Sequence, residues 1–305
     1  MIPTKRLGTT DLEISAVGLG AWPFSGGYDW SNRTVPDVAA ILSAAQACGI
    51  NWVDTAAIYE ESETALGKAL RGRRHQFVLA SKGGIIKKGS WPVHDLSTAS
   101  LTQQLESSLQ NLKTDYIDLY QLHYPDPNVP LQEALEVLFR FKKQGKIRAV
   151  GVCNVGESDL VQLPVLPDCV QNEFSVLHPQ KGKAVFAFCH KKKVPFVGYG
   201  TLCGGILSGK YKREPNFRRA DARNYFYRCY RGSEFEHAQN CVMRVRQVAT
   251  RLGQKPASVA VAWALSFPQV TAVLCGAKTP EQLLENAQGA QIKLSQADLS
   301  YLESA

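Results

Sequence analysis

No apolar run in this sequence approaches the roughly 20 residues that a membrane-spanning helix requires. The first 20 residues also lack the apolar core and the small-residue cleavage site of a secretory signal. The eight cysteines are scattered, and no two of them form a C-x-x-C pair. These absences predict a cytoplasmic protein that has no membrane partner, no disulfide framework and no zinc site.

The chain of 305 residues contains no low-complexity tract, no linker and no sequence repeat. Short apolar runs instead alternate with segments of helical period along its whole length. The predicted strands cover residues 15–21, 50–56, 77–82, 116–123, 147–154, 169–174, 194–200 and 270–277. The predicted helices cover residues 36–48, 62–70, 97–112, 130–144, 157–163, 181–192, 237–252, 256–265 and 280–288.

Repeated strand-helix units predict an α/β fold whose parallel sheet is covered by helices. An open doubly wound sheet that binds a dinucleotide would show G-x-G-x-x-G at its first turn. The stretch GLGAWPFSGG (18–27) has Phe24 where the third glycine would stand. Eight units without a break in composition therefore favour a (β/α)8 TIM barrel, formed as a single domain by residues 1–305.

The reactive groups of such barrels lie at the C-terminal ends of the strands and in the loops that follow them. A single polar residue at such a place has an ordinary structural explanation, such as capping a turn or facing solvent. Here almost every predicted strand leads to one, and the barrel brings these ends to the same mouth. The residues are Trp22, Asp54, Tyr59, Lys82, His123, Asn154, Gln171, Tyr199 and Lys278.

Four of these side chains suggest the protonation of a developing oxyanion. A phenol such as Tyr59 has an ordinary pKa near 10, and a nearby ammonium, here Lys82, lowers it. A buried ammonium stays charged when a carboxylate such as Asp54 pairs with it. His123 can then hydrogen-bond a substrate carbonyl. The set holds no nucleophile-base pair and no metal-ligand cluster, so something other than these side chains must supply the electrons.

Nine stretches resemble the sequences of aldo-keto reductases, in family order over nearly the whole chain. They are GLGAW (18–22), WVDTAAIY (52–59), SETALGKAL (62–70), LASKGG (79–84), DYIDLYQLHYPDP (115–127), GKIRAVGVCN (145–154), QNEFS (171–175), GILSGKY (205–211) and GAKTPEQLLEN (276–286). The resemblance implies that Asp54, Tyr59, Lys82 and His123 form the catalytic tetrad of that family. Tyr59 is then the proton donor for reduction and the acceptor for oxidation.

The resemblance also implies a nicotinamide cofactor, usually NADP(H), with NAD(H) as the other possibility. It assigns Asn154 and Gln171 to the carboxamide and Tyr199 to stacking on the nicotinamide ring, and it assigns the adenosine end to Gln282, Glu285 and Asn286. We place the stretch Gly200, Thr201 and Leu202 and the residues Arg223, Gly276 and Lys278 at the same cofactor site. Trp22 and Tyr124 are expected in the substrate pocket.

The segment around Lys278 supports NADP(H) independently of the resemblance. Thr279-Pro280-Glu281-Gln282 reads as a capping box with proline at the first helical position, so a helix begins there. The N-terminus of a helix attracts anions, and Lys278 precedes it directly. A 2′-phosphate suits this corner.

A basic segment, KYKREPNFRRADARNYFYRCYRGSEFEH (210–237), follows the seventh predicted strand. Arginines mixed with aromatic residues, in a chain of net charge +8, are also typical of nucleic-acid surfaces. Its place beside the phosphate-binding region of such barrels favours a long loop that covers the cofactor pyrophosphate, so we expect no nucleic-acid partner. Arg218, Arg219 and Arg223 are the candidates for that contact.

Three departures from the family pattern affect the expected pockets. The turn after Tyr59 reads Y-E-E-S-E, Tyr124 stands where tryptophan is frequent, and Gly200-Thr201-Leu202 stands where Ser-Pro-Leu is frequent. The substrate, a small carbonyl compound or alcohol, stays open. A sugar dehydrogenase and a redox-sensing subunit that retains its cofactor are the alternatives. We expect a monomer or a weak homo-oligomer.

Overall fold

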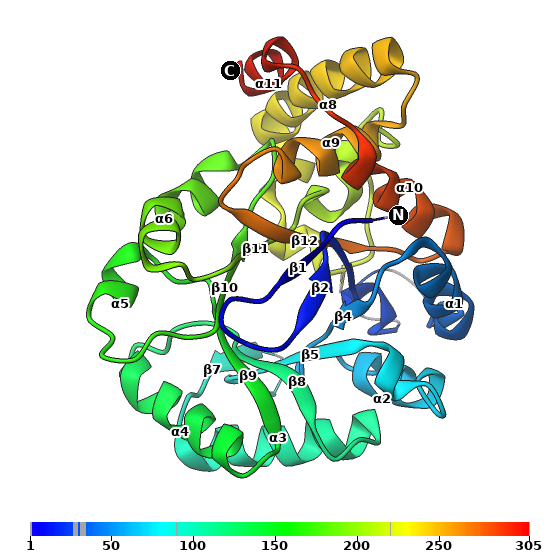
Figure 1. Cartoon of the computed structure of the whole chain (residues 1–305). Helices are drawn as coiled ribbons and strands as arrows, with labels where there is room; N and C mark the ends of the chain where they lie inside the picture. The colour runs from blue at the N-terminus through cyan, green and yellow to red at the C-terminus, as the bar shows by residue number, and fades with distance from the viewer. Residues whose placement is uncertain (1, 27–29, 31–34, 90, 220, 305) are drawn as a thin grey trace.

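The computed structural model describes residues 2–26, 30, 35–89, 91–219 and 221–304, and its central feature is a closed barrel of parallel strands (Figure 1). Around the barrel the strands follow one another in chain order, and each hydrogen-bonds its two neighbours. They are β3 (Val17–Gly20), β4 (Trp52–Asp54), β5 (Val78–Gly83), β8 (Ile117–Leu122), β9 (Ile147–Cys153), β10 (Cys169–Glu173), β11 (Phe196–Tyr199) and β12 (Val270–Gly276). The predicted TIM barrel and its eight strands are confirmed.

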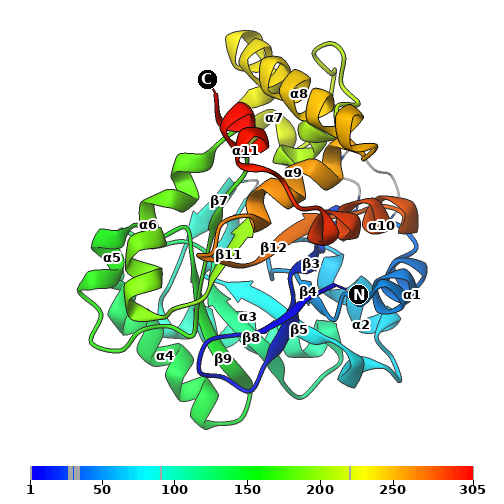
Figure 2. The same ribbon diagram turned by 45° about the horizontal axis from the view of Figure 1, so that its top comes forward.

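Helices surround the barrel, and each predicted helix is present. They are α1 (Val38–Cys48), α2 (Ser62–Ala69), α3 (Thr98–Leu112), α4 (Leu131–Lys143), α5 (Glu157–Val161), α6 (Pro179–Lys192), α8 (Gly232–Leu252), α9 (Pro256–Leu265) and α10 (Pro280–Gln288). Figure 2 shows that α8 and α9 lie together at one side of the barrel, beside the last helix, α11 (Gln296–Glu303). No helix in the described ranges is long and apolar enough to cross a membrane.

Among the described residues, two antiparallel hairpins lie outside the barrel, and the sequence patterns did not predict them. The first joins β1 (Thr4–Arg6) to β2 (Glu13–Ser15) and crosses the N-terminal end of the barrel (Figure 1). The second joins β6 (Ile85–Lys88) to β7 (Trp91–His94) after the third barrel strand. Both are short and exposed in part, so their apolar alternation is too brief to stand out.

The predicted loop after the seventh barrel strand contains more regular structure than expected. It includes α7 (Arg223–Phe226) and a 3₁₀ turn (Arg228–Tyr230), and α8 begins at Gly232, five residues before its predicted start. Residue 220 of this segment lies outside the described residues. The buried side chains Tyr227 and Tyr230 pack this segment against the rest of the protein, so tertiary contacts order a stretch that is rich in charge.

The barrel interior changes character along its axis. Its N-terminal part is a small apolar cluster made of inward-facing strand residues and of the β1–β2 hairpin, including Leu7, Leu12, Ile14 and Trp52. A larger apolar cluster fills the space between the strands and the helices. The C-terminal part of the interior instead holds buried polar side chains. The hairpin therefore closes one end of the barrel and leaves the other for a site.

Candidate active site

An ion pair between Asp54 and Lys82 forms the base of the site. Asp54 is the last residue of β4 and Lys82 lies in β5, and the two strands are neighbours in the barrel. Both side chains are buried, and the Lys82 Nζ also donates to the backbone oxygen of Thr55 at 2.9 Å. Because two fixed oxygen acceptors hold it, the ammonium can stay charged inside the protein.

Tyr59 lies in the turn between β4 and α2, and hydrogen bonds fix that turn to the barrel. Ala57 N donates to the backbone oxygen of Lys82 at 3.0 Å, and Ser62 Oγ donates to the backbone oxygen of Ala21 at 2.8 Å. The Lys82 ammonium lies 5.4 Å from the centre of the Tyr59 ring. The turn therefore delivers the phenol to the ion pair.

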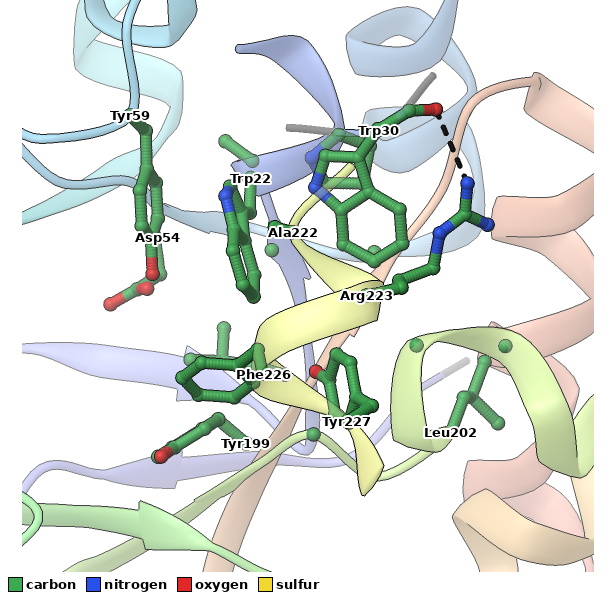
Figure 3. A pocket seen from close by; sticks show the side chains of 18 of the residues that line it. Trp22, Trp30, Asp54, Tyr59, Tyr199, Leu202, Ala222, Arg223, Phe226 and Tyr227 are labelled. Atoms are coloured by element: carbon green, nitrogen blue, oxygen red, sulfur yellow. Dashed lines mark hydrogen bonds between the residues drawn. The ribbon is translucent and has the colours of Figure 1, made fainter. Parts of the chain in front are cut away.

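Aromatic rings hold Tyr59 from two sides. Its ring stacks on Trp22 with centroids 5.5 Å apart and planes at 13°, which Figure 3 shows as two nearly parallel rings. On another side it meets His123 edge to face at 5.7 Å. Asp54, Tyr59, Lys82 and His123, which are distant in sequence, are thus brought together as predicted.

His123 follows β8 directly and is buried. Burial lowers the pKa of its imidazole well below the usual value near 6.5, and the positive charge of Lys82 and the nearby His94 lower that pKa further. The imidazole is therefore neutral at physiological pH. A neutral imidazole that carries one N–H can donate a hydrogen bond to a carbonyl oxygen without adding a full charge to the site.

The predicted amide residues lie beside the tetrad with their orientation set by hydrogen bonds. Asn154 Nδ2 donates to the backbone oxygen of His123 at 2.8 Å, and its Oδ1 accepts from the Tyr199 hydroxyl at 2.6 Å. Gln171 Nε2 donates to Asp54 Oδ2 at 3.0 Å. Asn154 has a φ of 59°, in the left-handed region that asparagine tolerates better than most residues.

A cavity of about 1390 Å³ opens from the tetrad and runs along the C-terminal ends of the strands. Except for Arg218 and for Lys82, which pairs with Asp54, every predicted site residue lines it. Its lining includes Trp22 and Tyr124 next to the tetrad, and at its far part Gly200, Thr201, Leu202, Arg223, Gly276, Lys278, Gln282, Glu285 and Asn286. One continuous space therefore connects the predicted chemistry to the predicted nucleotide end.

The end of the cavity that is predicted to hold the nucleotide, called the nucleotide end below, lies around the start of α10. Thr279 Oγ1 accepts a hydrogen bond from Gln282 N at 3.3 Å, which confirms the predicted N-cap. The reciprocal half of the predicted capping box is wrong, because Gln282 Oε1 accepts from Lys278 N at 2.9 Å. Burial, aided by Arg223 and Lys210, lowers the pKa of the Lys278 ammonium to about 8. Positive charges thus gather where an anion would neutralise them.

The arginine candidates of the basic segment differ in their surroundings. Arg223 is buried, pairs with Asp221 at 2.7 Å and donates to the Tyr211 hydroxyl at 2.9 Å. Figure 3 shows its guanidinium donating to the backbone oxygen of Trp30, a contact of 3.4 Å. Arg219 also lines the cavity, whereas Arg218 is not part of the lining.

One buried polar atom indicates whether the cavity suits a dinucleotide. Trp30 Nε1 is buried in the cavity wall and finds no hydrogen-bond partner among the described residues. Buried polar atoms of folded proteins normally have one, so this N–H group is available to donate to a polar ligand. Together with the charge at Lys278 and the size of the cavity, it fits a dinucleotide phosphate.

The sequence patterns missed Gln121, Trp30 and the β6–β7 hairpin, which adds Trp91 and His94 to the cavity wall. Gln121 had a signal, because it is a polar residue inside an apolar strand, two positions before His123. Trp30 and the hairpin had none, because long-range packing alone brings them to the mouth. All eight cysteines are free thiols.

Three side chains of types that can ligate a metal lie close together at one place in the described part of the chain. Ligand atoms of Glu173, His178 and Cys203 lie within 4.8 Å of one another. The Glu173 carboxylate already pairs with the Lys181 ammonium at 2.5 Å, and Cys203 Sγ lies 3.1 Å from Ser175 Oγ. The expectation that the protein uses no metal stays a prediction.

Comparisons with known proteins found a matching family, similar sequences and similar folds. The model of the aldo/keto reductase family matches residues 16–305. The chain is 34% identical to aldo-keto reductase YhdN of Bacillus subtilis, over 90% of this chain and 84% of that protein. It is 32% identical to the NADH-specific methylglyoxal reductase of Escherichia coli, over 97% and 96%. A solved structure of glycerol dehydrogenase AKR11B4 from Gluconobacter oxydans superposes with a TM-score of 0.84 at 27% identity, over 98% of this chain and 93% of that one.

Proposed function

The chain belongs to the aldo/keto reductase family of oxidoreductases, and from that premise we propose that it interconverts a carbonyl compound and its alcohol with NADP(H). The observation that carries the proposal is the buried Asp54–Lys82 pair beneath Tyr59 and His123, at one end of a cavity that reaches Lys278. A bound nicotinamide supplies the hydride, or accepts it in the reverse direction.

Each of the four tetrad residues then has one role in reduction. His123, neutral and buried, donates its N–H to the carbonyl oxygen and holds it beside Tyr59. Tyr59 gives its hydroxyl proton to that oxygen as negative charge develops on it. The Lys82 ammonium stabilises the phenolate that remains, and Asp54 keeps the ammonium in place. In oxidation the phenolate accepts the proton from the alcohol.

The cofactor would lie with its carboxamide at Asn154 and Gln171, its nicotinamide ring on Tyr199, and its adenosine end at Gln282, Glu285 and Asn286. Our preference for NADP(H) depends on Lys278 beside the N-terminus of α10, which favours a 2′-phosphate. One relative, the methylglyoxal reductase of Escherichia coli, is named as NADH-specific, so the preference needs a direct measurement.

The decisive experiment is the substitution Tyr59→Phe. We expect turnover of a panel of aldehydes, ketones, aldoses and polyols to fall by about 10² to 10⁴, the usual contribution of a general acid. NADPH should still bind, which the quenching of protein fluorescence measures. Tyr301→Phe, at an exposed position of α11, is the matched control and should leave turnover unchanged. Full activity of the Tyr59→Phe protein would overturn the mechanism.

The direction of the reaction and the alternatives are separated by rates. Initial rates of NADPH oxidation and of NADP⁺ reduction, measured at cellular cofactor ratios, distinguish a reductase from a sugar or polyol dehydrogenase. A cofactor that stays tightly bound while the wild type turns over nothing on the panel would favour the redox-sensing subunit. Steeply salt-dependent affinity for DNA or RNA would favour the nucleic-acid alternative.

A further inference from the structure

Gln121 occupies a central place in the polar part of the barrel interior. It lies in β8, two residues before His123, so both side chains point to the same side of the strand. Its exposed fraction is 0%. Its Nε2 donates to Asp54 Oδ2 at 3.0 Å, and its Oε1 accepts from Gln171 Nε2 at 3.1 Å. A single amide therefore bridges the partner of Lys82 to the amide assigned to the cofactor.

The hydrogen bonds in this network fix the orientation of the Gln171 side-chain amide. A carboxamide nitrogen carries two hydrogens, and Gln171 uses one for Asp54 Oδ2 and the other for Gln121 Oε1. Gln171 therefore turns its acceptor oxygen, and not its NH₂ group, toward the cavity that it lines. At the same time Asp54 Oδ2 accepts from both glutamines, while Asp54 Oδ1 accepts from Lys82.

We propose that Gln121 is a positioning residue that couples recognition of the nicotinamide carboxamide to the proton-donating tetrad. It fixes the orientation of Gln171, so that Gln171 Oε1 accepts from the carboxamide NH₂, and it supplies Asp54 with a buried hydrogen bond that stabilises its charge. The inference rests on the proposed function. Gln121 touches neither substrate nor cofactor, and acts through Asp54 and Gln171 alone.

The neighbouring strand is adapted to this role. A Cβ atom on Gly151 of β9 would lie 2.6 Å from Gln121 Cγ and 3.2 Å from its Oε1. Glycine at this position thus leaves the space in which the Gln121 side chain can extend between Asp54 and Gln171. Gly151→Ala displaces the amide without changing any polar group, which provides a test independent of substitutions at Gln121.

Substitution of Gln121 by methionine keeps its length and removes its polar atoms. We expect kcat/KM with NADPH to fall about 10- to 100-fold, the usual effect of losing a hydrogen bond to a buried charged group. Gly151→Ala should lower it in the same direction. Cys153→Ala is the control. It removes the contact of 3.6 Å from Cys153 Sγ to Gln121 Oε1 but leaves the hydrogen bonds from Gln121 and Gln171 to Asp54 in place. Thermal unfolding of each variant reports whether it folds.

Two readouts separate positioning from space filling. The carboxylic acid introduced by Q121E donates to Asp54 when protonated and repels it when ionised, so the activity of Q121E relative to wild type should rise toward acidic pH, whereas that of Q121M should not. The second readout is binding. The 3-acetylpyridine analogue of NADP⁺ lacks the carboxamide NH₂, and wild type should bind it more weakly than NADP⁺. That discrimination should shrink about threefold or more in Q121M.

Unchanged kcat/KM and unchanged discrimination against the analogue in folded Q121M would overturn the inference. Equal losses in Q121E and Q121M at every pH would reduce Gln121 to a packing residue and overturn it as well. These failures differ from a failure of the proposed function. If Tyr59→Phe is inactive while Q121M behaves as wild type, only the proposed role of Gln121 is wrong. If Tyr59→Phe keeps full activity, the proposed function itself is wrong.

Discussion

The two ends of the barrel interior are made by the same strands and yet have opposite chemistry. In β4, Trp52 belongs to the apolar cluster at the N-terminal end, and Asp54, two residues later on the same face, belongs to the tetrad. In β8, Leu119 and Gln121 show the same change. The period of two along a strand thus places an apolar packing residue and a buried polar residue of the site in adjacent layers.

The difference teaches where stability and reactivity come from in this protein. At the apolar end the β1–β2 hairpin inserts Leu7, Leu12 and Ile14 between the strands, and burial alone stabilises the contact. At the polar end burial is unfavourable unless each group has a partner. Asp54 therefore accepts from three side chains. The apolar end stabilises the fold within which the polar end can hold charge away from water.

The largest expected effect comes from Lys82→Met, which removes the ion pair at the polar end of the barrel interior. This change leaves Asp54 a buried carboxylate without its ion-pair partner, and such losses cost about 3–5 kcal/mol in the free energy of unfolding. Turnover should disappear as well, because nothing then stabilises the phenolate of Tyr59. Urea unfolding and steady-state kinetics measure the two effects.

The double substitution Asp54→Asn with Lys82→Met sharpens that prediction. Because both charges are gone, the free energy of unfolding should recover in part, while turnover stays absent. A double variant that regains activity, or a single variant as stable as wild type, would show that the ion pair does not have the role assigned to it.

The apolar end should respond in the opposite way. Leu12→Ala removes a buried side chain from the hairpin and should lower the free energy of unfolding by about 2–5 kcal/mol. Because Leu12 lies at the end of the barrel away from the tetrad, kcat/KM of the folded protein should not change. Val161→Ala on the exposed face of α5 is the control and should have little effect on either quantity. A large loss of kcat/KM in folded Leu12→Ala would mean that the two ends are not separable.

The smallest expected effect concerns the charge at the nucleotide end. The pKa of Lys278 is lowered to about 8, so the ammonium is charged below that pH and loses its charge above it. The ratio of NADPH to NADH affinity should therefore fall as pH rises through 8. Lys278→Met should lower the ratio about tenfold at pH 7 and remove its pH dependence, in keeping with the loss of one charged hydrogen bond. Lys191→Met, on the exposed end of α6, is the control. A ratio that does not change with pH or with Lys278→Met would place the 2′-phosphate elsewhere.

Much of this architecture could be predicted because its signals are local. Each barrel strand is a short apolar run followed by a helical pattern, and Asp54, Lys82 and His123 stand where such runs end. The N-cap at Thr279 is likewise a local signal, since residue type and spacing suffice to recognise it. The partner of the Gln282 side chain is not a local signal of this kind, because its Oε1 accepts from Lys278 N and not from the N-cap residue.

The sequence alone determined the barrel, the order of its strands and the residue types that meet at its mouth, because periodicity and strand ends are properties of neighbouring residues. Only the tertiary structure decided that Trp30 and Arg223, nearly 200 positions apart, share a contact, and that Gln171 turns its oxygen toward the cavity. Such choices depend on which donors and acceptors the closed barrel brings together, and a buried polar group takes the partner that folding places beside it.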